Sequence, residues 1–129
     1  MSATHSFIAR WEIGQRVKDI CLDFEEYGDA PTAVTNFARE LQMTVQELWL
    51  LRQFANQFSR DMATRLTTKT TASGRLLTWS HVQLLLHFSD PELLYRWIAR
   101  CYRQELSVRE LSRALQELHA AEEVHKAEA

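Results

Sequence analysis

Apolar residues recur at intervals of three and four along almost the whole chain, and no stretch keeps the alternating pattern of a β-strand. This spacing places apolar side chains on one face of an α-helix. Glycine and proline, which interrupt helices, occur only three and two times. The pattern predicts an all-α fold, a compact bundle of about six helices.

The first predicted helix runs from about Thr4 to Glu26 and ends near residues 27–29, Tyr-Gly-Asp. Its apolar stripe predicts a set of inward-facing residues, namely Phe7, Ile8, Trp11, Val17, Ile20, Cys21 and Phe24. Pro31 suits the first turn of a second helix. That helix is expected to bury Val34, Phe37, Ala38 and Leu41.

The second helix is expected to stop at residues 42–43, and Thr44 with Glu47 forms a capping-box pair that opens a third helix to about Phe58. Two helices joined by so tight a turn indicate a helix-turn-helix. The predicted inward face of the third helix is Leu48, Leu51, Ala55 and Phe58.

Residues 64–75 are rich in Thr and Ser, and we interpret them as an exposed mobile loop that carries Lys69 and Arg75. A fourth helix follows from about Thr78 to His87. Asp90 and Pro91 then have the order of an N-cap and a first-turn proline, which predicts a fifth helix to about residue 104.

Ser107 with Glu110 is a second capping-box pair, and it opens a sixth helix to about Leu118. We expect residues 1–118 to form a single helical domain and residues 119–129 to be a frayed acidic tail. Cys21 and Cys101 lie far apart in helical contexts, which favours buried free thiols over a disulfide.

Composition places the chain among ordinary globular proteins, because 46% of its 129 residues are hydrophobic and 25% are charged. No apolar run is long enough to span a membrane, and residues 1–6 lack the features of a signal peptide. The expected location is therefore cytoplasmic, without membrane contact.

Charge is segregated along the chain although the net charge is only −2. Residues 1–59 carry five Lys and Arg against eight Asp and Glu, a net of −3. Residues 60–113 carry nine against five, a net of +4, and residues 114–129 carry one against four, a net of −3. The middle segment is therefore the candidate for binding an anionic partner.

Three arginines of the fifth predicted helix, Arg96, Arg100 and Arg103, lie opposite its apolar stripe, and we call them the arginine face. Arg109 and Arg113 project from the next helix. With Lys69 and Arg75, these groups could neutralise several phosphates of DNA. The alternative is a solvated face whose charges pair locally with Glu92, Glu105, Glu110 or the acidic tail.

The third helix leaves several residues outside its apolar stripe, and these support two interpretations. Gln46 and Gln53 could contact adenine edges in a major groove, with Arg52 near a phosphate or a guanine. Trp49 and Leu50 are large and apolar, and they favour packing within the chain or against a second subunit.

His81 stands among apolar residues, which favours a core or capping role over chemistry. The other histidines and the two cysteines do not have the spacing of a zinc site, and no serine or cysteine has a nucleophile motif. The three glycines are isolated, so no phosphate-cradling loop is predicted. We expect no enzyme activity, catalytic residue, metal or cofactor.

Several segments together resemble the N-terminal helical domain of YhcG-type bacterial proteins. These segments are WEIGQRV (11–17), EYG (26–28), LRQFANQF (51–58), LTWSHVQLLL (77–86), DPE (90–92) and LSVREL (106–111). In that family the domain usually precedes a nuclease-like domain of the PDDEXK superfamily and is thought to bind DNA. The resemblance implies the DNA-binding half only, with a separate nuclease as a possible partner.

Residues 33–115 also resemble the DNA-binding domain of ParB-type partition proteins, in which a helix-turn-helix precedes a Ser-x-x-His-x-x-x-Leu-Leu helix. This resemblance implies that Thr44, Gln46 and Glu47 begin a recognition helix, and that a partition protein is a possible partner. Val45 and Glu47 depart from the polar or basic residues usual there.

The combined hypothesis is a non-enzymatic DNA-binding helix-turn-helix protein, a small regulator or accessory factor, acting as a homodimer. The alternative is a protein–protein adaptor that docks through Trp49 and Leu50 without binding DNA.

Overall fold

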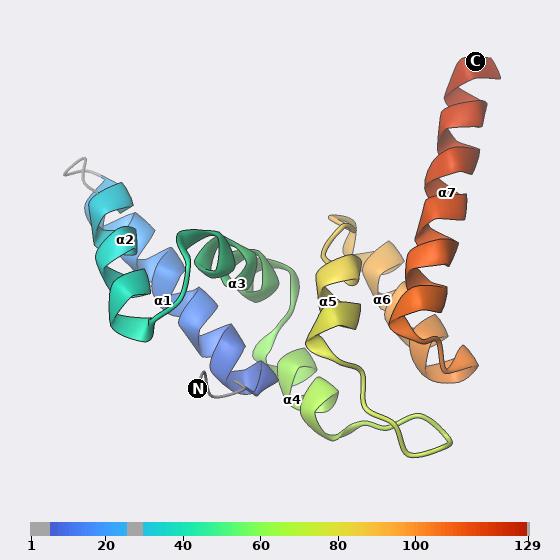
Figure 1. Ribbon diagram of the computed structural model, residues 1–129, viewed down its shortest axis with the longest axis horizontal. Coiled ribbons are helices and arrows are strands. Elements are labelled where there is room, and N and C mark those ends of the chain that lie inside the picture. The colour runs from blue at the N-terminus through green and yellow to red at the C-terminus, as the bar shows by residue number, and fades with distance from the viewer. Residues whose placement is uncertain (1–5, 26–29, 129) are drawn as a thin grey trace. The chain divides into compact units, whose positions relative to one another are not determined.

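The computed structural model describes residues 6–25 and 30–128, and within these residues every regular element is a helix (Figure 1). This confirms the predicted all-α fold. Seven helices are described, one more than the sequence predicts. They are α1 (Phe7–Glu25), α2 (Ala30–Leu41), α3 (Val45–Gln57), α4 (Arg60–Thr68), α5 (Trp79–Leu85), α6 (Pro91–Gln104) and α7 (Val108–Glu128).

The helices form two compact units, an N-terminal unit (Met1–Lys69) and a C-terminal unit (Thr70–Ala129). In the N-terminal unit, α1 packs against α2, α3 and α4 (Figure 1). Its core centres on fully buried residues of α1 and α3, with Phe54 and Phe58 in ring contact at 4.8 Å between centroids. The indole Nε1 of Trp11 donates to the backbone oxygen of Phe58 at 2.8 Å, which ties α1 to the end of α3.

Gly14 is the point of closest approach between α1 and α3. A Cβ atom at this position would overlap the backbone carbonyl of Leu51 and lie 3.0 Å from the Cβ of Ala55. Only glycine therefore fits where the two helix backbones meet. The close contact lets Leu48, Leu51 and Ala55 bury their side chains against α1, as the sequence predicts.

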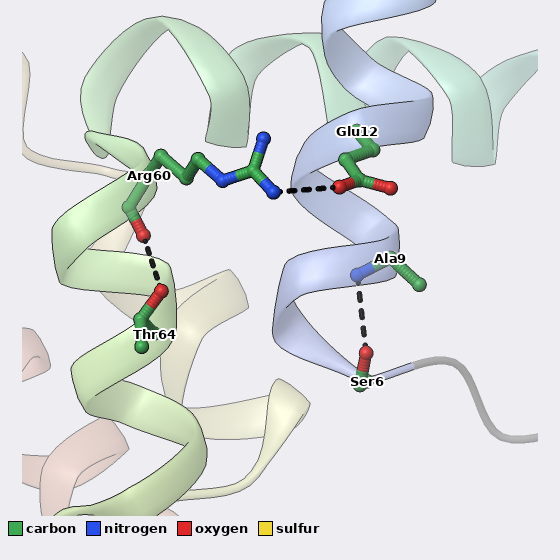
Figure 2. A network of polar contacts seen from close by, with 5 residues as sticks. All are labelled: Ser6, Ala9, Glu12, Arg60 and Thr64. Atoms are coloured by element: carbon green, nitrogen blue, oxygen red, sulfur yellow. Dashed lines mark hydrogen bonds and ion pairs between the residues drawn. The ribbon is translucent and has the colours of Figure 1, made fainter.

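Helix α4 corrects the prediction of a loop over residues 64–75, because the first five of these residues are helical. Ser59 caps α4 by accepting from the backbone N–H of Met62 at 3.1 Å, and Ala63 and Leu66 are fully buried. At the start of α4, Arg60 pairs with Glu12 of α1 at 3.2 Å (Figure 2). Figure 2 also shows the Thr64 hydroxyl donating to the carbonyl of Arg60.

In the C-terminal unit, α5 packs against both α6 and α7. The core contains Val82 and Leu85 of α5 with Leu94 and Cys101 of α6. Phe88, just after α5, stacks on Trp97 with 5.5 Å between ring centroids. Leu111 anchors the first part of α7, which continues as a long helix (Figure 1).

The local start signals predicted from the sequence are confirmed. Thr44 and Glu47 form the expected capping box, and Asp90 caps α6 with Pro91 in the first turn. The backbone N–H of Ser107 donates to Glu110 at 3.0 Å, and the Ser107 hydroxyl accepts from the Glu110 N–H at 3.1 Å.

Some predicted boundaries and buried positions are wrong. Helix α7 extends past Leu118, the predicted end, and α5 is shorter than the predicted segment to His87. Phe24 is 40% exposed near the end of α1, so it does not join the core as predicted. The predictions for Thr4 and for residues 26–29 lie outside the described residues.

His81 is a buried scaffold residue, as its apolar surroundings predict. Its Nδ1 accepts from the backbone N–H of Thr78 at 3.0 Å, and the Thr78 hydroxyl accepts from the backbone N–H of His81 at 3.4 Å. These two bonds form a capping box in which histidine takes the place usual for Glu or Gln.

Candidate nucleic-acid interface

Helix α6 presents the arginine face to solvent because the opposite side of the helix is buried in the core. Asp90 accepts from the backbone N–H of Glu92 at 3.0 Å and Pro91 occupies the first turn, so the helix start is set. The buried side, which fixes the rotation of α6 about its axis, consists of Leu94, Trp97, Ile98, Cys101 and Tyr102. Arg96 and Arg103 are thereby exposed, and Arg100 is half-buried.

The three guanidinium groups of the arginine face have different surroundings. Arg96 pairs with Glu92 one turn earlier at 3.0 Å. Arg100 lies over the Trp97 ring, 4.6 Å from its centroid, and its Nε donates to Gln104 at 3.0 Å. Arg103 has no carboxylate partner among the described residues. The arginine face lines an open hollow of ≈ 400 Å³ together with Leu93, Trp97 and Ala99.

Nearby carboxylates decide how much of this charge is available to a ligand. Glu105 accepts hydrogen bonds from the backbone N–H and the hydroxyl of Ser73. Glu110 is occupied by the cap at Ser107. Of the predicted local partners Glu92, Glu105 and Glu110, only Glu92 therefore forms an ion pair with the arginine face in the described part of the chain.

The pKa values of these acids reflect the same contacts. The hydroxyls of Ser73 and Thr71 and the backbone N–H of Ser73 lower the pKa of Glu105, and the charge of Arg75 lowers it further. The backbone N–H and hydroxyl of Ser107 lower the pKa of Glu110, with a smaller contribution from Arg113. Both carboxylates are therefore ionised and engaged at neutral pH.

The remaining predicted cations are distributed over other elements. Arg109 and Arg113 are exposed on α7, and Arg75 is exposed in the segment between α4 and α5. Lys69 belongs to the N-terminal unit, where its backbone N–H caps the end of α4 by donating to Arg65 at 2.7 Å. Arg60 and Arg65 of α4 are also exposed, and both lie in the basic middle segment of the sequence.

The predicted recognition residues lie on α3 in the N-terminal unit. The Thr44 hydroxyl accepts from the backbone N–H of Glu47 at 3.0 Å, so its acceptor is used by the cap. Gln46 is exposed, and Gln53 is half-buried. Arg52 is half-buried, with its guanidinium 5.5 Å from the centroid of the Trp49 ring.

An apolar surface surrounds the other predicted contact residues of α3. Trp49 is 39% exposed, and Leu50 is half-buried. Sequence reasoning missed an adjoining groove of ≈ 350 Å³, lined by Lys18, Cys21, Leu22, Ala30, Arg52 and Asn56. Leu22 of α1 lines this groove and is 66% exposed. This surface combines apolar side chains with two cations.

The described residues contain no group of three or more His, Cys, Asp or Glu side chains arranged to hold a metal ion. Within the same residues, no helix has the length and apolar character needed to cross a membrane.

Residues 3–120 match the family described as the DUF1016 N-terminal domain. The chain belongs to this family. The match confirms the predicted relationship to the N-terminal domain of YhcG-like proteins. No curated protein and no solved structure matches the chain. The similarity to ParB-type partition proteins stays a prediction.

The matched range of this DUF1016 N-terminal domain contains the arginine face, the α7 arginines and the whole of α3. The arginine face and the apolar surface of α3 therefore both lie within the matched range. Within the C-terminal unit, the structure brings together the residues of the arginine face. Gln46, Arg52 and Gln53 belong to the N-terminal unit and form a separate candidate surface.

Proposed function

We propose that this protein is a non-enzymatic DNA-binding protein, a small regulator or accessory factor, that holds the phosphate backbone through its arginine face. The observation that supports the proposal most directly is the engagement of Glu105 and Glu110 in caps and turns. This leaves Arg100, Arg103 and Arg109 without an ion pair in the described part of the chain. Arginine is suited to phosphate because its planar guanidinium donates two parallel hydrogen bonds.

The spacing of the arginine face fits a nucleic-acid strand. Residues 96 and 103 are separated by about 10 Å along the helix axis at 1.5 Å per residue. A strand of duplex DNA presents one phosphate per about 3.4 Å of its axis. Because each guanidinium stands at the end of a long side chain, the three arginines can contact at most one phosphate each on a strand that passes α6. Leu93 and Trp97 provide apolar surface beside the cations.

The test measures the affinity of the full chain for mixed-sequence duplex DNA at two or more salt concentrations. Wild-type protein should bind at low salt and lose affinity as the salt concentration rises, because bound phosphates release their counterions. The triple variant Arg96→Gln, Arg100→Gln and Arg103→Gln should bind more weakly. The negative slope of log K against log salt should become shallower by about 2.7, which corresponds to three lost phosphate contacts.

A second triple variant controls for net charge. It replaces three arginines of the acidic segment 1–59, namely Arg10, Arg16 and Arg39, with glutamine. This control should lose less affinity and keep most of the salt slope. Negligible binding at low salt, a flat salt dependence, or equal losses in the two triple variants would overturn the proposal. Nuclease activity of the purified chain would overturn its non-enzymatic part.

Base reading by α3 is the finer part of the proposal. Gln46 is exposed near the start of α3, where a recognition helix contacts base edges. Arg52 and Gln53 would contribute from the same helix. Gln46→Ala should reduce the discrimination between DNA sequences while leaving the salt slope unchanged. If Gln46→Ala and wild type discriminate equally between DNA sequences, Gln46 does not read bases and the proposed role of α3 fails.

The second candidate function is a protein–protein adaptor or homodimer that uses the apolar surface of the N-terminal unit. The exposure of Trp49 and Leu22 beside a groove favours it, because exposed apolar surface of this kind marks interaction sites. The double variant Trp49→Gln and Leu50→Gln should abolish association with the partner or with a second copy, measured by light scattering, and an adaptor of this kind should have no DNA affinity to lose. Unchanged mass in solution would remove the homodimer.

A further inference from the structure

Glu105 occupies a position that favours another residue type. It ends α6 with a left-handed backbone, φ 49°, where glycine or asparagine is usual. Its carboxylate also lies at the C-terminal end of a helix, where the helix dipole disfavours negative charge. Two local preferences therefore oppose this residue. Such a conflict indicates that the side chain makes a compensating contact elsewhere.

That contact is with the segment before α5. The Glu105 carboxylate accepts from the backbone N–H of Ser73 at 3.1 Å and from the Ser73 hydroxyl. The hydroxyls of Ser73 and Thr71 are the main causes of the lowered pKa of Glu105. Glu105 is thus held in its ionised form by a turn 32 residues earlier in the sequence.

The turn itself holds the backbone of Arg75. The backbone N–H of Thr71 donates to the carbonyl of Arg75 at 2.8 Å, and the N–H of Arg75 donates to the Thr71 hydroxyl at 3.2 Å. The N–H of Gly74 closes the turn on the Thr71 carbonyl at 2.9 Å. Thr71 is only 8% exposed, so the turn is anchored at its base. Residues 71–75 are therefore bonded both internally and to the end of α6.

We propose that Glu105 is a positioning residue of the DNA-contacting surface, which holds the Thr71–Arg75 turn against the end of α6 and thereby fixes Arg75 near the helix end that also carries Arg103. This inference rests on the proposed DNA binding and extends it. It adds Arg75, as a positioned phosphate contact, to the three contacts of the arginine face. It also gives a carboxylate a supporting role at a cationic surface.

The sign of the expected effect separates this role from simple electrostatics. Removing a carboxylate from a surface that binds phosphate should strengthen binding, because one repulsive charge is lost. If Glu105 positions Arg75, the same change should weaken binding, because the arginine loses its fixed place and must be ordered during association. The two readings of Glu105 therefore predict opposite changes in affinity.

The test uses Glu105→Gly in the full chain, because glycine accepts the left-handed backbone and also removes the carboxylate from the helix end. This variant should fold, and circular dichroism and thermal unfolding should check that it does. Its matched control is Gln42→Gly at the end of α2, which also has a left-handed backbone, φ 57°. The control relieves a similar strain in the N-terminal unit without touching Glu105 or the turn.

Affinity and salt dependence are then measured for Glu105→Gly, Arg75→Ala and the double variant. Each single variant should bind more weakly than wild type. The slope of log K against log salt should become shallower by about 0.9, the value of one phosphate contact. The double variant should lose no more than Arg75→Ala alone, because both changes remove the same contact. Gln42→Gly should bind as wild type does.

Several outcomes would overturn the inference while leaving the proposed function intact. The first is tighter DNA binding by Glu105→Gly, the second is additive losses in the double variant, and the third is no effect of Arg75→Ala. Each of these counts against the inference alone when the arginine-face triple variant still binds DNA more weakly than wild type. If the arginine-face triple variant binds as wild type does, the DNA-binding proposal fails and the role of Glu105 fails with it.

Discussion

The imidazole Nε2 of His81 lies 2.8 Å from the backbone carbonyl oxygen of Leu106. On the other side of the ring, Nδ1 accepts from the backbone N–H of Thr78, so Nε2 carries the proton and donates it to Leu106. One side chain thus caps the start of α5 and satisfies a carbonyl in the turn between α6 and α7. Because Leu106 follows Glu105 directly, this hydrogen bond ties α5 to the end of α6.

Replacing His81 should separate its two roles. His81→Ala removes the acceptor for the Thr78 N–H and the donor to the Leu106 carbonyl, and the loss of a helix cap alone costs about 0.5–2 kcal/mol. His81→Gln keeps the capping box, because glutamine serves at this position, but an amide turned back to Thr78 does not also place a donor opposite Leu106 as the rigid ring does. Urea unfolding should therefore rank the free energy of unfolding as wild type, then His81→Gln, then His81→Ala. Equal stability of the two variants would contradict the double role.

The sequence predicts most helix starts correctly because the signals that define them are local. Thr44 and Glu47 lie three residues apart, as do Ser107 and Glu110, and Asp90 precedes Pro91 directly. Capping depends on hydrogen bonds within one turn, so distant residues do not change it. His81 at the third position of α5 extends the capping-box rule to a residue type that the sequence pattern does not identify.

Helix α4 was missed because its stability comes from distant contacts. Its threonines have low helix propensity, but the hydroxyls of Thr64, Thr67 and Thr68 donate to carbonyls four residues earlier. Leu66 is completely buried, and α4 packs against α1. Burial therefore outweighs propensity in this segment, and the composition of residues 64–75 gives no sign of it.

The candidate site was predictable only in part, for the same reason. Helical periodicity places the arginine face correctly, because the core fixes which side of α6 is exposed. Which groups the nearby carboxylates bind depends on residues that are distant in sequence. Glu105 is a plausible partner for arginine from the sequence, but the turn at Ser73 binds it. The arginines are therefore less neutralised than sequence neighbours indicate.

Gly14→Ala should destabilise the protein, although the same change stabilises most exposed helices. In a solvated helix, alanine is favoured over glycine by about 1 kcal/mol. At residue 14 the added Cβ overlaps the Leu51 carbonyl, so α1 and α3 must separate, which we expect to cost about 1–3 kcal/mol or more. Asn36→Ala on the exposed side of α2 is the control and should be neutral or stabilising. A rise in the urea midpoint of Gly14→Ala would refute the close contact.

Glu92→Gln should strengthen DNA binding. The substitution removes the carboxylate that pairs with the arginine face in the described part of the chain, and it frees Arg96 for phosphate. A surface ion pair is worth about 0.2–1 kcal/mol, so the gain should be up to about fivefold in affinity. Glu40→Gln on α2 changes the net charge equally and should have a smaller effect. Binding should be measured well below the unfolding temperature, because Glu92 also stabilises the start of α6. A weaker or unchanged affinity would argue against the role of Arg96.

Acid should destabilise the C-terminal unit through Glu105 and Glu110. Hydrogen bonds lower the pKa of both carboxylates in the folded protein below the ordinary value of 4.5. Their stabilising contribution is therefore complete above that value and decreases as the pH falls through it toward the folded-state pKa. Glu110→Gln retains an N-cap partner but does not titrate, so its acid unfolding midpoint should lie at lower pH than that of wild type. An unchanged midpoint would show that the Glu110 cap contributes little to acid unfolding.

The two cysteines should differ sharply in reactivity, since both are free thiols in different surroundings. Burial raises the pKa of Cys101 to about 11, despite the opposing charge of Arg100, and its side chain is inaccessible in the core. Cys21 is half-buried and lines the groove of the N-terminal unit. At pH 8 a thiol reagent should therefore modify Cys21 quickly and Cys101 only as the C-terminal unit unfolds locally. Cys21→Ser should remove the fast phase, and denaturant should make both fast. Two fast phases in the native protein would show that α6 does not seal Cys101 in the core.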